Sequence, residues 1–587
     1  MIRKLLRAVA RLIVWVCTFV GFVIVSGALC LYLMNREHQP KSLAHDTVLT
    51  LTLEGSYVDH HTGLPGLSAI ATGGQGSLYD VTRAIMHGAK DKKVVGLILR
   101  IETPSLSTAQ IQEIRDALLV FQKEGKPAWC YTDSFGELGS GTGLYYLATA
   151  CPHITVQPLG MVNLIGISME SPFAKGALDK LGVVPNLIQK KEYKSYEEIF
   201  TREDFSLPAR EALQATVDSF LSQIVDGIAQ ARKLPPDHVR ALIETGPYVL
   251  EAAKTSRLID KIGFYDDLLA DLKKNFDTSM DYMDVDAYLK TLPLDLPGEG
   301  IALIFGTGTI QREKSPVFGG EATIDTETLC TAFQDAADDP HVKAIVFRID
   351  SPGGSPLASE TIRHALEQVK KPIIISMGSA AASGGYWIAL PGSQIVAQPA
   401  TLTGSIGAMG GKFVLAGLFE KLGIHWGRVS THENATLGSF SDPYTPLQQA
   451  QVDLWIQQIY DAFVSRVSKS RHMTPEQVEK VARGRVWTGE QAFALGLVDH
   501  LGGLHTAIGM AQKVAGLPMD APLHLFPKPR SLLETLAEVV SGAHEASLLA
   551  PQIRILMEGC QFLHQVRAYF PSSQATVSMP FKEIHAL

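Results

Sequence analysis

VKAIVFRIDSPGGS, residues 342–355, joins a continuous apolar stretch to a turn that contains two glycines. Its part 344–349 is rich in β-branched and aromatic residues, which is typical of a strand covered on both faces of a parallel sheet. IALIF at 301–305 and PIIIS at 372–376 have the same character, and 359–369 reads as a helix. Alternating strands and helices with short glycine-rich turns predict an α/β fold with a largely parallel sheet. In such sheets, functional sites form at the carboxyl ends of strands.

The same pattern occurs a second time, earlier in the chain. The matching segments are 94–104 with 342–352, 153–166 with 394–407, 180–183 with 421–424, and 258–263 with 497–502. The offset between copies drifts from 248 to 239, as small loop insertions would produce. Four matches in one order indicate a structural repeat. We therefore predict a tandem duplication, with halves at about 46–290 and 298–515.

The amino terminus carries an apolar segment of membrane-spanning length. Residues 12–34 are 23 residues without a charge, and the segment 1–11 before them holds four basic residues and no acidic one. About 20 apolar residues cross a bilayer, and a basic flank stays in the cytoplasm. A cleaved signal peptide fits less well, because the apolar core is long and no clear Ala-x-Ala site follows. We expect an uncleaved anchor with the following chain exported. The tail 516–587 reads as helical, and it suggests a packing or assembly element.

The composition excludes several classes of protein. With 46% hydrophobic and 19% charged residues the chain is not disordered, and a formal net charge of -8 offers no basic field for nucleic acid. No two of the six cysteines have a Cys-x-x-Cys spacing. Neither a zinc site nor a disulfide framework is expected from this pattern.

Ser383 is the candidate nucleophile. It lies in MGSAAASGGYW (377–387), between very small residues and just before an apolar helix. The N–H of Gly384 would then lie at a helix N-terminus, which favours an oxyanion. A helix-capping role for Ser383 is the alternative. In the first copy the helix persists from Thr142, but the small-residue clearing is absent and Ser105-Leu106 replaces the glycine pair 353–354. Capping alone does not explain that difference.

A serine hydroxyl needs a base, and the sequence offers two kinds. His364, His425 and His432 lie in the second half, but none has a recognisable triad setting. The first half has a lysine-rich segment at 190–195. A lysine can act as a base only if burial lowers its pKa from about 10.4 towards 7–8. Spacing alone does not choose between these candidates.

Ser-Pro-Gly-Gly, Ala-Ala-Ser-Gly-Gly-Tyr-Trp and Leu-Thr-Gly-Ser-Ile-Gly together resemble the signal peptide peptidase A (protease IV) family, S49, of ClpP-fold serine proteases. The doubled length and the apolar amino terminus are similar to its long bacterial form. The resemblance implies tandem ClpP/crotonase-like domains and a Ser/Lys dyad split between the halves. It also implies a homotetramer that uses no metal or other cofactor. Its substrates would be leftover signal peptides at the periplasmic face of the cytoplasmic membrane.

The resemblance also assigns roles to individual residues. The family's Tyr-Lys-Ser element falls on 193–195, which makes Lys194 the general base for Ser383. Ser405 would orient that lysine. The oxyanion donors would be the N–H groups of Gly384 and Gly354.

The duplication supports a shared site independently of the family. Lys194 aligns with Ala435 or a near neighbour in the second copy, where no lysine occurs. Ser383 aligns with Thr142, and Ser405 aligns with Leu164. One copy keeps the base and the other keeps the nucleophile, which is the expected result when two fused subunits share one site. The sequence leaves open whether the pair forms within one chain or between chains.

Two other functions fit part of this pattern. A crotonase-type acyl-CoA enzyme would share the fold and the glycine loops, but it normally relies on carboxylates and lacks an exported anchor. A catalytically inactive scaffold or membrane-partner protein would keep the fold and lose the dyad. Ser383, Lys194 and Ser405 are all present, which favours a peptidase.

Overall fold

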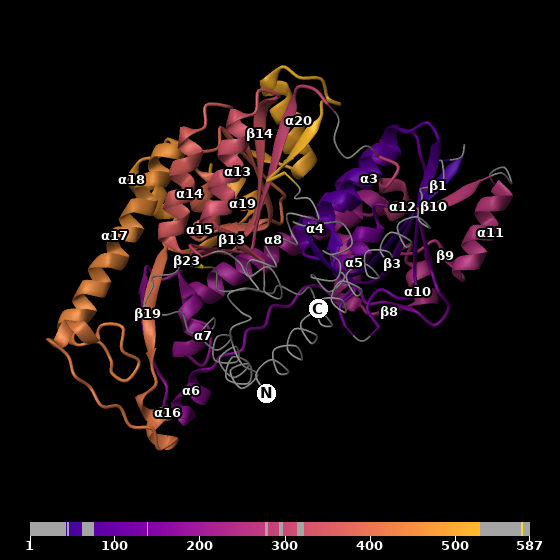
Figure 1. Ribbon diagram of the computed structural model, residues 1–587. Coiled ribbons are helices and arrows are strands. Elements are labelled where there is room, and N and C mark those ends of the chain that lie inside the picture. Colours follow the sequence, from indigo (N-terminus) through magenta and orange to yellow (C-terminus); the bar gives the residue numbers. More distant parts are fainter. Residues whose placement is uncertain are drawn as a thin grey trace, which may run out of the picture.

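The computed structural model describes residues 43, 46–60, 75–137, 139–275, 280–292, 297–313, 322–528 and 577–578. Two α/β halves lie side by side in it (Figure 1). The predicted anchor at 12–34 and most of the tail lie outside the described residues. No helix within the described part of the chain is long and apolar enough to cross a membrane.

The first half is built on a seven-stranded sheet with parallel pairing between neighbours. Its strands run in the order β10 (Asp281–Asp284), β1 (Thr47–Val58), β3 (Val94–Ser105), β4 (Ala128–Thr132), β5 (His153–Val156) and β9 (Lys261–Ile262), and β2 (Gly76–Ser77) pairs with the end of β1. The helices of this half are α3 (Leu78–Lys90), α4 (Thr108–Lys123), α5 (Thr142–Ala148), α6 (Lys175–Leu181), α7 (Glu198–Thr201), α8 (Leu207–Arg232), α9 (Pro236–Thr245), α10 (Leu250–Thr255), α11 (Tyr265–Asn275) and α12 (Val285–Leu289). A short antiparallel pair joins β6 (Met161–Val162) to β8 (Tyr248–Val249).

The second half repeats this plan with an eight-stranded sheet. Its order is β20 (Val486–Thr488), β18 (Leu402–Gly404), β16 (Ile373–Ala382), β14 (Val342–Ser351), β11 (Gly300–Thr307) and β22 (Leu523–Phe526), with β17 (Gln394–Ala397) and β21 (His500–Leu501) at one side. The helices are α13 (Thr326–Asp338), α14 (Pro356–Gln368), α15 (Gly384–Ala389), α16 (Ala416–Lys421), α17 (Pro446–Arg471), α18 (Pro475–Val481), α19 (Gly489–Ala494) and α20 (Leu504–Ala515). A smaller sheet contains β12 (Thr309–Gln311), β13 (Thr323–Asp325), β15 (Gly353–Gly354) and β23 (Val577–Ser578).

Apolar side chains on both faces hold the second sheet between helices. Ile345 and Phe347 of β14 point into a core that includes residues of α13 and α14, whereas Ala344 and Val346 pack with α20. This alternation explains the continuous apolar pattern of the strand. The predicted α/β class and its duplication are confirmed by the two sheets. The prediction of a helical tail is wrong for residues 523–526, which form strand β22 and extend the second sheet by pairing in parallel with β11.

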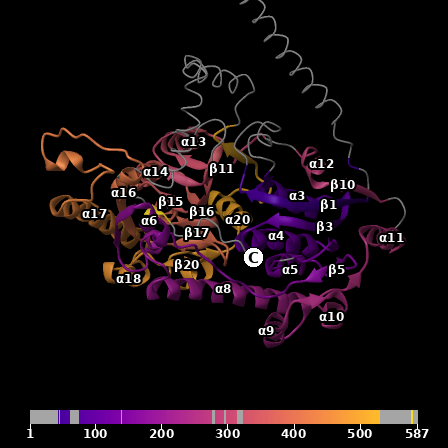
Figure 2. The same cartoon turned by 90° about the horizontal axis from the view of Figure 1, so that it is seen from below.

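The first half reaches across the second through two long connections. Strand β7 (Val184–Lys190) pairs antiparallel with β19 (Ala408–Val414) of the second half over seven residue pairs. Helix α8 then runs along the lower side of the second half before the chain returns to the first (Figure 2). The turn after β7 is thereby brought to the carboxyl ends of the second half's strands.

Candidate active site

Ser383 occupies a sharp turn between β16 and α15. Its backbone has φ 57° and ψ −117°, a conformation that non-glycine residues adopt rarely and mostly at functional sites. The Ser383 N–H donates to the carbonyl of Gly404 (2.8 Å), and its own carbonyl accepts from Trp387 N (2.9 Å). A Cβ at Gly384 would lie 2.7 Å from Ser359 Oγ, and one at Gly385 would lie 2.7 Å from the Ser351 carbonyl oxygen. The small residues around Ser383 are therefore required by close packing.

Lys194 reaches this turn from the first half. The β7–β19 ribbon ends with Lys190 opposite Ala408, and Lys190 Nζ lies 2.6 Å from Asp453 of the second half. Two further ion pairs follow along the chain, Lys191 with Glu479 (2.8 Å) and Glu192 with Arg483 (2.6 Å). The N–H of Tyr193 donates to the carbonyl of Arg483 (3.1 Å). These contacts fix the backbone just before Lys194.

The structure brings three of the predicted site residues into direct contact within one chain. Lys194 Nζ lies 2.7 Å from Ser383 Oγ, 3.0 Å from Ser405 Oγ and 3.2 Å from the Ser405 carbonyl oxygen. All three side chains have 0% exposure. Burial lowers the pKa of Lys194 from 10.5 to about 7. A large fraction of Lys194 is therefore the neutral amine near neutral pH, and this amine can accept the proton of a serine hydroxyl.

Two residues that the sequence analysis did not single out shape the surroundings of Lys194. A Cβ at Gly484, which has φ +86°, would lie 2.4 Å from the backbone nitrogen of Lys194. Glu197 is 6% exposed on the short 3-10 turn Ser195–Glu197, and its pKa is raised to about 8 by burial. The amide of Gln189, with its nitrogen facing these acceptors, donates to Glu197 Oε2 (2.9 Å) and the Lys194 carbonyl (3.1 Å). Nothing in the local sequence marks Gly484, whereas Glu197 stands three residues from the lysine.

The predicted oxyanion donors lie side by side near Ser383. Gly354 belongs to β15, which pairs with Ile310 of β12, and a Cβ at Gly354 would lie 2.1 Å from the Ile310 carbonyl oxygen. A Cβ at Gly384 would lie 3.2 Å from Gly354 N. Glycine is thus needed at both positions. Their main chains approach each other next to the nucleophile turn.

The other candidates lie elsewhere. His364, His425 and His432 are exposed on the surface, unlike the buried Ser383. In the first half, Thr142 Oγ1 accepts hydrogen bonds from Ile165 N and Gly166 N, both at 3.1 Å, and so helps to hold its own loop. Among the described residues, no group of three or more His, Cys, Asp or Glu is arranged to hold a metal ion.

Comparison with known proteins places the chain in a family. The model of peptidase family S49 matches residues 120–279 and again 365–518. Protease 4 of Salmonella typhi is 32% identical over 570 residues, which cover 91% of this chain and 90% of that protein. The chloroplastic serine protease SPPA of Arabidopsis thaliana is 32% identical over 84% of this chain and 73% of its own length.

Shorter relatives and a solved structure match part of the chain. A putative signal peptide peptidase SppA of Enterococcus faecium is 32% identical over 32% of this chain and 55% of its own length. A ClpP1 mutant of Listeria monocytogenes covers 35% of this chain and 94% of its own, with 14% identity and a TM-score of 0.24. The repeated family match and the relatives that span both halves give the conclusion directly: this chain belongs to peptidase family S49 and is a serine peptidase.

Proposed function

We propose that the protein hydrolyses peptide bonds with a Ser383–Lys194 dyad assembled from its two halves. The observation that carries this proposal is the 2.7 Å contact between Lys194 Nζ and Ser383 Oγ, with both side chains buried. A buried lysine whose pKa is near 7 is matched to general base catalysis at neutral pH.

The geometry supports a two-step acyl transfer. Neutral Lys194 removes the proton of Ser383 Oγ, which attacks the scissile carbonyl carbon and forms a tetrahedral intermediate. The N–H groups of Gly384 and Gly354 stabilise the oxyanion, and the lysinium then protonates the leaving amine. In the second step Lys194 deprotonates a water that attacks the acyl carbon, and the lysinium returns the proton to Ser383 Oγ as the bond between Oγ and the acyl carbon breaks. Ser405, 3.0 Å from Nζ, keeps the lysine oriented between these steps.

An extended polypeptide fits this site through its main chain. The two residues of β23 pair antiparallel with Gly353–Gly354, so this loop accepts a strand along its edge. Main-chain pairing of this kind binds extended peptides with side-chain pockets adding selectivity. We infer that substrates bind as strands against Gly353–Gly354, with the scissile carbonyl at Ser383.

The amino terminus and the name of one relative support a proposal for the substrates and the location of the enzyme. Residues 12–34 and the basic segment 1–11 support a single anchor in the cytoplasmic membrane, with the catalytic body on the periplasmic side. The name of the Enterococcus faecium relative refers to signal peptides. We propose that this protein degrades residual signal peptides released beside it in that membrane.

We further propose that chains assemble head to tail into a ring. Within one chain, α8 of the first half packs on the second half, where Ser219 Oγ lies 2.9 Å from Thr488 Oγ1. The corresponding helix of the second half is α17, since both are 26 residues long and start after Ser206 and Thr445 caps. Leu454 on α17 is 61% exposed, and Leu159 on the first half is fully exposed. If α17 of one chain packs on the first half of the next chain as α8 packs on the second half within a chain, Leu454 and Leu159 become buried. Repeating this head-to-tail contact closes the chains into a ring. Four copies is the number that the family resemblance implies.

Substituting Leu454→Glu should therefore dissociate the assembly without unfolding the protein, because it places a charge on the proposed contact. Mass photometry of the detergent-solubilised full chain would show an oligomer for the wild type and a monomer for the variant. Leu422→Glu is the control, because Leu422 is also exposed but lies outside this surface. An unchanged mass for Leu454→Glu would contradict the proposed contact.

The dyad itself is tested by covalent labelling. The detergent-solubilised protein is treated with a serine-directed phosphonate, beside a Lys194→Ala variant, and mass spectrometry locates the adduct. An adduct on Ser383 that forms in the wild type and is lost in the variant is expected. Labelling that survives in Lys194→Ala would place the base elsewhere. A folded wild type that takes no label would favour the inactive scaffold.

Glu197 should tune the pH dependence of hydrolysis. An ionised Glu197 raises the pKa of Lys194, whereas burial lowers it. Activity should rise with pH as Lys194 loses its proton, with the rise centred near pH 7 for the free enzyme. Because burial raises the pKa of Glu197 to about 8, its negative charge acts on the upper part of this rise, and Glu197→Gln should let the rise in kcat/KM finish at lower pH. Glu192→Gln, which changes a surface partner of Arg483, is the control and should leave the profile in place.

A further inference from the structure

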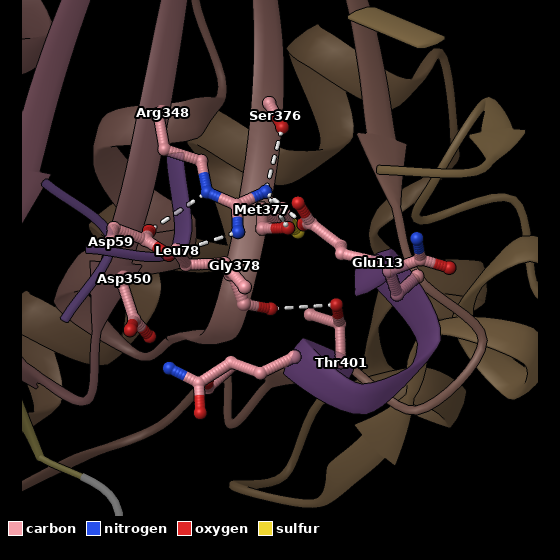
Figure 3. Close-up of polar contacts among 12 residues, drawn as sticks. Asp59, Leu78, Glu113, Arg348, Asp350, Ser376, Met377, Gly378 and Thr401 are labelled. Carbon is pink, nitrogen blue, oxygen red and sulfur yellow. Dashed lines mark hydrogen bonds and ion pairs between the residues drawn. The ribbon is translucent and has the colours of Figure 1, made fainter. Parts of the chain in front are cut away.

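A buried arginine, Arg348, joins the two halves (Figure 3). Arg348 of β14 donates to Asp59 of the first half through Nε (2.8 Å to Oδ2) and Nη2 (3.0 Å to Oδ1). Its Nη1 lies 2.5 Å from Glu113 Oε1 on α4 of the first half. The same nitrogen donates to Ser376 Oγ (3.0 Å) and to the Met377 carbonyl (3.1 Å) of β16. One guanidinium thus holds two carboxylates of the first half against two strands of the second.

Asp350 lies next to this arginine and makes a different contact. Its Oδ1 accepts a hydrogen bond from Ala380 N (2.9 Å) on β16. Ala380 precedes Ser383 by three residues, and Asp350 precedes Gly353 by three residues. This single bond therefore ties the strand that ends at the nucleophile to the strand that ends at the glycine loop.

The side chains of Asp350 and Asp59 approach each other at Gly378. A Cβ at Gly378 would lie 2.9 Å from Asp350 Cβ and 2.9 Å from Asp59 Oδ2. Asp350 thereby contacts both the active-site strands and the place where the first half docks. Docking of the first half matters for catalysis because that half supplies Lys194.

The charges of this cluster do not balance when every carboxyl is ionised. The groups that face Asp350 are Asp59 at the end of β1, Glu113 on α4 and Arg348 on its own strand, with Asp116 and His505 farther out. Three carboxylates share one guanidinium, and burial lowers the pKa of His505 to about 4, which leaves its ring neutral. Asp59 and Glu113 contact the guanidinium directly, and burial also raises the pKa of Glu113, although the guanidinium opposes this. Burial and the nearby Asp59 raise the pKa of Asp350 to about 7.

We propose that Asp350 is a positioning residue of the active site. Its protonated carboxyl links β16, the strand that leads to Ser383, to the loop at Gly353–Gly354, and it allows both to pack against the first half, which supplies Lys194. Loss of the proton adds a negative charge beside Asp59, which already shares the guanidinium with Glu113, and weakens the docking of the halves. This inference rests on the proposed Ser383–Lys194 dyad for its effect on catalysis. Its effect on stability does not depend on the dyad.

Two variants separate the hydrogen bond from the charge. Asp350→Ala removes the acceptor of the Ala380 N–H and should slow phosphonate labelling of Ser383 and lower kcat by about 100-fold, the scale expected for a misplaced reacting group. Asp350→Asn keeps an acceptor oxygen and should retain about a third or more of the wild-type rate at neutral pH. The control is Glu102→Gln, since Glu102 aligns with Asp350 in the first copy and pairs with Arg100 near the surface.

Thermal unfolding as a function of pH gives the second readout. A carboxyl with a raised pKa in the fold keeps its proton longer than in the unfolded chain, so wild-type stability falls as pH rises from about 4 to about 7. Asparagine carries no such proton. The unfolding temperature of Asp350→Asn relative to the wild type should therefore increase over this range and level off above it. Glu102→Gln should show no such trend.

The outcomes are distinct. A difference in unfolding temperature that does not change with pH would overturn the proton-linked role, and a trend seen instead for Glu113→Gln would move the proton to Glu113 and overturn it as well. Full labelling of Ser383 in folded Asp350→Ala would overturn the positioning role. If the wild type itself takes no label on Ser383, the proposed dyad fails, and the unfolding series still decides the charge of Asp350.

Discussion

Replacing Lys194 by methionine should abolish peptide hydrolysis and at the same time make the protein more stable. The catalytic loss follows from removing the base, since loss of one member of such a catalytic unit typically costs about 10⁴-fold or more in kcat. Methionine has a similar length and no proton to exchange. Residual hydrolysis should fall to the level that the oxyanion donors alone can sustain.

The gain in stability follows from the cost of burying a lysine. A pKa of about 7 in the fold, against 10.5 ordinarily, corresponds to a penalty on the order of 5 kcal/mol when the unfolded chain carries the charged form. The lost hydrogen bonds to Ser383 and Ser405 offset about 1 kcal/mol each. We therefore expect a net stabilisation of about 2–3 kcal/mol near pH 7. Such a trade of stability for function is common at active sites.

The difference in stability between Lys194→Met and the wild type should depend on pH. Between pH 7 and 10.5 the unfolded chain binds more protons at Lys194 than the fold does, so wild-type stability rises with pH. The advantage of Lys194→Met should be largest at and below pH 7, disappear near about pH 9, where the falling penalty equals the lost hydrogen bonds, and reverse above that pH. Denaturant unfolding at several pH values measures this. Lys190→Met is the control, because Lys190 lies in the same segment, is partly exposed and pairs with Asp453. A Lys194→Met protein that is less stable at pH 6 would show that Lys194 is not desolvated as described.

Sequence alone predicted the fold class well, for a local reason. The apolar runs at 301–305, 344–349 and 372–376 became β11, β14 and β16, since each is buried on both faces. The helix expected at 359–369 became α14, which starts at Pro356 after the Ser355 cap. These elements depend on residues close together in the chain. Strand β22 was missed because its pattern is short, although the duplication has a counterpart in β10 at the same sheet edge.

The candidate site was only partly predictable from the residues. Ser383 has a local signal, because the small residues before an apolar helix correspond to tight packing at the turn. Lys194 has none, since its burial depends on the β7–β19 pairing with residues more than 200 positions away. The duplication and the family resemblance were needed to single it out. The Arg348 cluster was also missed, because Asp59 and Glu113 meet Arg348 only when the halves dock.

Gly484 controls how closely the main chains of the two halves approach each other at Lys194, so replacing it should have a large effect on activity. A Cβ there would lie 2.4 Å from the backbone nitrogen of Lys194 and 2.6 Å from its Cα, so one of the two main chains must move. Gly484→Ala should shift Lys194 away from Ser383 by a fraction of an ångström to about 1 Å. Misplacement of this size can cost about 100-fold in rate, and we expect a loss of that order in kcat and in phosphonate labelling.

The matched control separates this clash from backbone strain. Gly423 has φ +69°, similar to the +86° of Gly484, but a Cβ there would meet nothing within 4 Å. Both alanine variants pay a left-handed backbone cost of about 1 kcal/mol, whereas only Gly484→Ala presses on Lys194. Equal activities for the two variants would mean that Lys194 tolerates the displacement. A selective loss in Gly484→Ala, with unfolding temperatures of the two variants alike, would show that the rate depends on the close approach of two backbones from opposite halves. Catalysis would then depend on how closely the two halves pack together as well as on the chemistry of Ser383 and Lys194.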